Sequence, residues 1–116
     1  MDTRDNDREL VERILTDYAS IPYPTSDALH TQTIFDRSND RYVLMNVGWE
    51  QNAGRKERVY YPLIQIDLID GKFWIQHDGT DVGIAKELER GGIPKTRIVL
   101  AFREPEVRPY TEYAAG

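Results

Sequence analysis

The sequence of 116 residues predicts an α+β fold, in which two helices cover an antiparallel sheet made of two hairpins and a further strand. Three observations lead to this prediction. An early segment has helical apolar spacing, the middle of the chain is rich in strand-forming residues between turn signals, and a second, shorter helical pattern follows. A sheet with one apolar face needs a cover, and only two helices are available.

The first element is an amphipathic helix, expected from Asp7 to Tyr18. Its apolar side chains follow helical spacing and are Leu10, Val11, Ile14, Leu15 and Tyr18. The helix should stop near Ile21, because Pro22 and Pro24 lack a backbone donor and disfavour helical geometry in the residues before them. Residues 21–27 are then a connector.

The middle of the chain predicts four strands in two hairpins, which form an antiparallel meander. Residues 29–35 and the run RYVLMNVGW are strand-prone, and the polar residues 37–40 between them indicate a turn. A loop is expected around 51–56. The run VYYPLIQIDLI then leads through Asp70-Gly71 into KFWIQ, and an Asp-Gly pair between apolar runs is a strong hairpin signal. Trp74 is expected to pack within this strand.

A second helix is expected from Asp81 to Arg90, with Thr80 as its N-cap and a short apolar stripe on one side. Two glycines at 91 and 92 end it. The following run IVLAF is compact and apolar, which predicts one more buried strand.

Length and composition favour one domain over residues 1–116 and a cytoplasmic protein. The chain has no cysteine, no apolar run long enough to span a membrane, and a charged amino terminus unlike a signal peptide. Twenty acidic residues against fifteen basic ones give a formal charge of −5. Such a charge repels a polyanion unless the arginines gather on one face, so unaided, sequence-independent DNA binding is disfavoured.

Acidic residues and histidines offer the few candidates for catalysis. The carboxylates that could hold a divalent metal are Asp67, Asp70, Asp78 and Asp81. Turn and cap positions explain them better, because acidic residues are common there for local hydrogen bonding. His30 and His77 are isolated from each other and from a nucleophile. We therefore predict no catalytic residue, no metal site and no cofactor.

Two further patterns have ordinary structural explanations. Gly79 and Gly83 flank a helix start as in phosphate-binding loops, but the lysine of such a loop is missing. A basic patch at Arg55, Lys56 and Arg58 has aromatic residues nearby, which are Trp49, Tyr60 and Tyr61, and such mixtures can bind nucleic acid. A solvated loop beside packed strands is the preferred interpretation in a chain of negative charge.

The carboxy-terminal tail provides the candidate partner-binding residues, namely Arg108, Tyr110 and Tyr113. Arginine and tyrosine dominate the energetics of protein interfaces, and the prolines at 105 and 109 reduce the entropy lost on docking. The alternative, in which the tail folds back over its own sheet, is equally open.

Three blocks carry a family resemblance, namely TIFDRSNDRYVLMNVGWE, LIDGKFWIQHDGTDVGIAKEL and GIPKTRIVLAFREPEVRPYTEYA. In this order they resemble the XisI family of cyanobacterial controlling factors for excision of the fdxN element. The resemblance implies an accessory role in DNA recombination, beside XisH-type proteins that resemble restriction-type endonucleases, and it supplies no catalytic residues. The chain departs from the family at residues 51–62 and at Gln65, where relatives often carry histidine.

The resemblance and the residues together predict a non-enzymatic regulatory subunit that binds a XisH-like protein and reaches DNA only through that complex. A homo-oligomer is compatible with so small a core. Two alternatives stay open. One is a direct DNA-binding accessory factor, and the other is a small metal-dependent hydrolase in which Asp67, Asp78 and His77 converge.

Overall fold

A computed structural model describes residues 3–21 and 28–116. Its helices are α1 (Thr3–Ala19) and α2 (Ile84–Arg90), and its strands are β1 (Leu29–Asp36), β2 (Arg41–Asn52), β3 (Arg55–Ile69), β4 (Lys72–Asp78) and β5 (Ile98–Leu100). A short 3-10 turn, η1 (Lys95–Arg97), precedes β5, and a second one, η2 (Arg108–Tyr110), lies in the carboxy-terminal tail. Of the connector predicted at 21–27, residues 22–27 lie outside the described residues.

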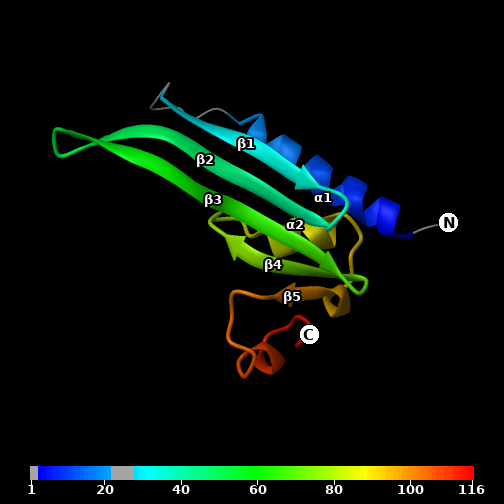
Figure 1. The fold of residues 1–116 in the computed structure, drawn as a ribbon. Helices are drawn as coiled ribbons and strands as arrows, with labels where there is room; N and C mark the ends of the chain where they lie inside the picture. The colour runs from blue at the N-terminus through cyan, green and yellow to red at the C-terminus, as the bar shows by residue number, and fades with distance from the viewer. Residues whose placement is uncertain (1–2, 22–27) are drawn as a thin grey trace.

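One sheet holds all five strands in chain order, and both helices lie on the same side of it (Figure 1). The first four strands pair antiparallel, whereas β5 pairs in parallel with β4 after the crossover through α2. The predicted α+β class is therefore confirmed, with a sheet that is mixed rather than wholly antiparallel. The parallel pairing follows from the helix, which returns the chain to the end of the sheet where β4 began.

The core lies between the helices and the sheet. Buried apolar side chains from α1 and α2 face those of the strands, and the largest of these are Tyr42, Phe73, Leu15, Leu44, Ile64 and Ile66. Alternation along the strands sends the neighbouring residues to the opposite side. We call that opposite side of β1, β2 and β3 the open face, because no described helix covers it (Figure 1).

Two hairpin turns show why one prediction held and another failed. Asp70 and Gly71 have φ values of 49° and 76°, as the Asp-Gly signal requires. The loop expected around 51–56 does not exist, because β2 and β3 continue to a tight turn at Ala53-Gly54, with φ values of 53° and 80°. The meander thus has three hairpins instead of two, and its middle one is a long arm (Figure 1).

The start of α2 also differs from the prediction. The helix begins at Ile84, three residues later than expected, and Thr80 does not cap it. Instead, the Asp78 carboxylate accepts hydrogen bonds from the Ile84 amide at 2.8 Å and from the Thr80 amide at 2.9 Å. A carboxylate at the end of β4 takes over the capping role, since its two oxygens can reach both the turn and the helix.

Glycine is required at position 48 of β2. Gly48 has φ of +147°, and a Cβ atom there would lie 1.9 Å from the carbonyl oxygen of Ala28. The same carbonyl accepts a hydrogen bond from the Trp49 amide at 3.2 Å. The close approach holds the entry into β1 against β2.

Candidate protein-interaction site

The carboxy-terminal tail folds back along the sheet beyond β5. The Ala114 amide donates to the Ile98 carbonyl at 2.8 Å, and Ala114 forms a parallel bridge with Val99. In Figure 1 the end of the chain lies beside β5, on the side of the sheet away from β1. The tail therefore packs in a defined position against the rest of its own chain.

Arg108 holds the turn of this tail. Its guanidinium donates to the carbonyls of Ala101 and Arg103, both at 3.0 Å, and lies 5.5 Å from the centre of the Trp74 ring. Trp74 is half-buried and points away from the core side of β4, where its neighbours Phe73 and Ile75 are fully buried. The expectation that Trp74 packs with those neighbours is thus corrected, since the tail covers it from the other side.

Tyr113 and a group of charges fasten the tail to α2. The Tyr113 hydroxyl donates to Glu89 at 2.8 Å, and Lys86 bridges to Glu112 at 3.1 Å. Hydrogen bonds from Lys95 and Tyr113 lower the pKa of Glu89 to about 2. Burial, and then the bond to Glu89, raises the pKa of Tyr113. These contacts keep Glu89 ionised below its ordinary pKa of 4.5, down to about 2.

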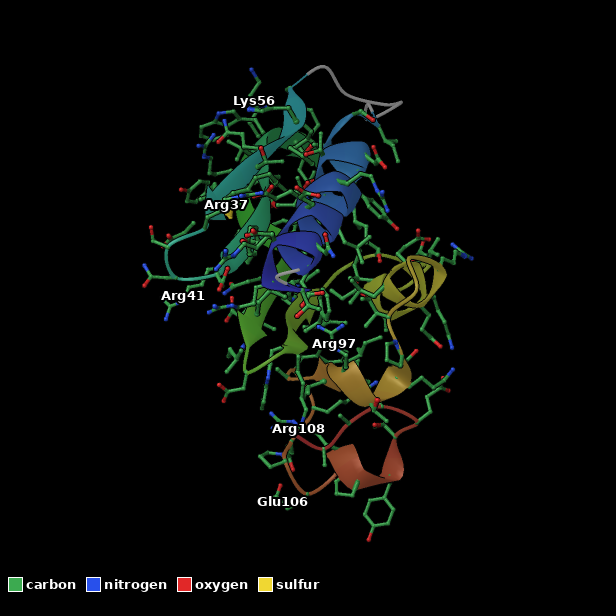
Figure 2. All side chains as sticks on the ribbon, turned by 90° about the vertical axis from the view of Figure 1, so that its right-hand side faces the viewer. Arg37, Arg41, Lys56, Arg97, Glu106 and Arg108 are labelled. Carbon is green, nitrogen blue, oxygen red and sulfur yellow. The ribbon has the colours of Figure 1, made fainter. Side chains whose placement is uncertain are left out.

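Tyr110 has the opposite environment. Its side chain is 90% exposed at the end of η2, although the backbone around it is held by the bonds of Arg108. Figure 2 shows this segment, with Arg108 and Glu106 labelled, below the sheet. Of the three residues predicted to bind a partner, two make intramolecular contacts and one projects outward. Their role in binding stays a prediction.

The carboxylates weighed as metal ligands do not converge. Asp67 accepts hydrogen bonds from Gln65 at 3.3 Å and Gln76 at 3.1 Å on one side of the sheet. Asp78 pairs in register with the core residue Ile64 and so lies on the other side. Among residues 3–21 and 28–116, no group of three or more His, Asp or Glu could hold a metal ion. Asp70 is a turn residue and Asp81 is exposed.

The two histidines are far apart in the sheet. His30 lies on β1, with its Nε2 atom 3.1 Å from the side-chain amide nitrogen of Gln32, and His77 is exposed near the end of β4. The glycine pair is equally local, because the Gly79 amide donates to Leu63 and the Gly83 amide to Thr80. The arrangement that a hydrolase with Asp67, Asp78 and His77 would need is absent from the described residues.

The basic patch lies on the β2–β3 arm. Arg58 lies 5.3 Å from the Trp49 ring centre and 5.6 Å from that of Tyr60, so the three side chains share one face. Many of the other cations bind carboxylates elsewhere on the molecule, namely Arg8, Arg37, Lys86, Arg90, Lys95 and Arg97. Such pairing spreads positive charge over the surface instead of gathering it.

Sequence patterns do not indicate the contact between Arg108 and Trp74, or the two side-chain amides that bind Asp67. Both contacts join strands or turns through side chains that are distant in the chain or separated by a bulge.

Neither helix in the described part of the chain has the length and apolar character that a membrane crossing requires.

Comparisons with known proteins give one consistent result. The family model described as XisI protein matches residues 1–115. The crystal structure of a XisI-like protein from Anabaena variabilis is 36% identical, with a TM-score of 0.85, over 97% of this chain and 99% of that one. The crystal structure of fdxN element excision controlling factor XisI from the same organism is 29% identical, with a TM-score of 0.81, over 99% and 100%. No curated protein matches the chain.

Proposed function

Because the chain belongs to the XisI family, we propose that it is a non-enzymatic controlling factor for excision of a DNA element. In this proposal it acts as the regulatory subunit of a XisH-like, endonuclease-like protein in the cytoplasm. The name of the similar Anabaena structure, an fdxN element excision controlling factor, supports the excision role. In this proposal the chemistry on DNA belongs to other proteins, so this chain needs no cofactor or metal of its own.

The exposure of Tyr110 is the observation that carries the proposal. A single exposed aromatic side chain is ordinary on a protein surface. Tyr110, which is 90% exposed, differs because it stands on a turn that is already ordered. A preorganised anchor loses less entropy on binding than a free tail would. We assign Tyr110 as the anchor, Arg108 as a positioning residue for it, and Tyr113 as the residue that fastens the tail to α2.

Copurification with a XisH-like protein tests this role. The Tyr110→Ala variant should fold normally and bind the partner at least thirtyfold more weakly, as expected when an interface anchor is truncated. Tyr61→Ala is the matched control, because Tyr61 is also an exposed tyrosine (51%) but lies on the β2–β3 arm. Wild-type binding by Tyr110→Ala would exclude the tail as the interface, and no binding by the wild type would exclude the partner.

Direct DNA binding is less well supported. It would need arginines on one face, and six of the described cations serve local ion pairs around the molecule, namely Arg8, Arg37, Lys86, Arg90, Lys95 and Arg97. In our proposal, DNA contact therefore belongs to the partner.

A further inference from the structure

The open face carries an apolar centre that no described element covers. Val43, Met45 and Val47 of β2 alternate onto this side, and they pair in register with Ile34 of β1 and Pro62 of β3. Ile34 is 49% exposed, Val43 and Met45 are half-buried, and Val47 is buried, with 8% of its surface exposed. Ile34, Val43, Met45 and Pro62 thus form an apolar band across three strands, with Gln32 and Gln65 beside it on the same face. An exposed apolar band of this kind is typical of an interaction surface.

The two ends of this patch differ in charge. At one end Arg58 lies between Trp49 and Tyr60, which are 48% and 64% exposed, and Lys56 follows two residues away on the same side. Among the described residues, neither cation has a carboxylate within ion-pair distance. This end is therefore positive and aromatic.

The other end is negative. Asp36, Arg41 and Asp67 stand side by side in register on β1, β2 and β3, so two carboxylates flank one guanidinium. In Figure 2 Lys56 and Arg41 lie on the same side of the molecule, with Lys56 above Arg41. Charges of opposite sign at the two ends of one apolar patch make the surface complementary to itself when it is turned end for end.

We propose that the open face binds the open face of a second copy of this chain, with the strands of the two sheets running antiparallel. A two-fold axis that crosses the strands at Met45 and Pro62 satisfies the whole pattern. It places Arg58 over Asp67 of the second copy, and Trp49 over its Arg41. The valines at 43 and 47, each two residues from Met45, then face each other across the axis.

The competing arrangement, with parallel strands, is disfavoured by the same charges. An axis along the strands would place Arg58 of one copy beside Arg58 of the other, and the acidic ends together. Like charges placed opposite each other reduce affinity strongly. The antiparallel dimer is a β-sandwich of two sheets, with α1 and α2 of each copy on its outer surfaces.

Neighbouring tyrosines provide a first test, measured by sedimentation of the purified chain. Tyr60 pairs with Val47 on the open face, whereas Tyr61 pairs with Asn46 on the helix side. The wild type should dimerise with a micromolar or tighter dissociation constant. Tyr60→Ala should weaken the dimer at least tenfold, and Tyr61→Ala should leave it unchanged. A wild type that stays monomeric at about 100 μM overturns the proposal.

Charge reversal tests the orientation. In the proposed dimer, residue 58 of each copy lies over residue 67 of the other copy. Arg58→Glu alone, or Asp67→Lys alone, places like charges together at both of these contacts and should weaken the dimer at least tenfold. Mixing the two variants restores opposite charges at both contacts, so a heterodimer of wild-type affinity should form. This recovery also shows that each variant folds, although Asp67 binds two amides and Arg58 binds the Gly48 carbonyl.

The remaining outcomes refute the arrangement. A dimer unaffected by either charge reversal lies on another surface, such as the free edge of β1. If the two variants dimerise no better when mixed than each does alone, the strands of the two copies do not run antiparallel. The measurement uses this chain alone, so its failure leaves the proposed role with a XisH-like protein intact.

Discussion

Replacing Arg108 by alanine should release the tail without unfolding the core. The change removes two hydrogen bonds to backbone carbonyls and the contact with the Trp74 ring. Arg108 is partly exposed, so each hydrogen bond contributes about 1 kcal/mol. The cation–π contact adds about 0.5–1 kcal/mol. The free energy that keeps the tail closed should therefore fall by about 2–3 kcal/mol.

Hydrogen exchange of the Ala114 amide measures this opening, because that amide is bonded to the Ile98 carbonyl only while the tail is in place. A loss of 2–3 kcal/mol corresponds to exchange that is about 30- to 150-fold faster. Arg103→Ala is the control, because Arg103 is exposed and its guanidinium lies over the exposed ring of Phe102, 5.3 Å from the ring centre. Unchanged exchange in Arg108→Ala, or equal acceleration in both variants, would refute the role assigned to Arg108.

Four further expectations concern the fold, its pH dependence and its chemistry. Gly48→Ala should cost at least about 2 kcal/mol in denaturant unfolding, whereas Gly54→Ala, with positive φ but open space around it, should cost about 1 kcal/mol; equal costs would contradict the close approach to Ala28. The lowered pKa of Glu89 means that its contribution to stability is complete above its ordinary value of 4.5 and is lost as the pH falls toward about 2. Glu89→Gln should therefore flatten the acid dependence of the melting temperature over that range, and an unchanged profile would count against the ion pairs. The isolated chain should bind random duplex DNA more weakly than micromolar at physiological salt, because its formal charge is −5, and tight binding in a filter assay would contradict this reasoning. Incubation with DNA and Mg²⁺ or Mn²⁺ should give no cleavage, and metal-dependent cleavage abolished by Asp78→Ala would overturn the non-enzymatic proposal.

Elements defined by local patterns could be predicted from the sequence. The apolar spacing of α1 and the Asp70-Gly71 turn both depend on residues within a few positions of each other. The turn at Ala53-Gly54 was missed because polar residues surround it, so the strands of the arm carry no alternating apolar signal. The arm is exposed on both sides, and its strands are held by backbone pairing.

Contacts between distant segments could not be predicted in the same way. Nothing within β5 indicates that it pairs with β4 in parallel, since that choice depends on the crossover through α2. The candidate site has the same limit. The types of Arg108, Tyr110 and Tyr113 suggested an interface, but only the folded tail separates the exposed residue from the two that hold it.

The late position of β5 in the chain also affects biosynthesis. A nascent chain can pair β1 to β4 as soon as Asp78 has emerged, but β4 gains its outer neighbour only when Ile98 to Leu100 are available, and Trp74 gains its cover only with Arg108. At usual translation rates, about 1–4 s pass between Asp78 and Leu100. During that interval the backbone edge of β4 and the ring of Trp74 lack their cover. This edge of β4 is therefore where an incomplete chain most easily pairs wrongly with another nascent chain.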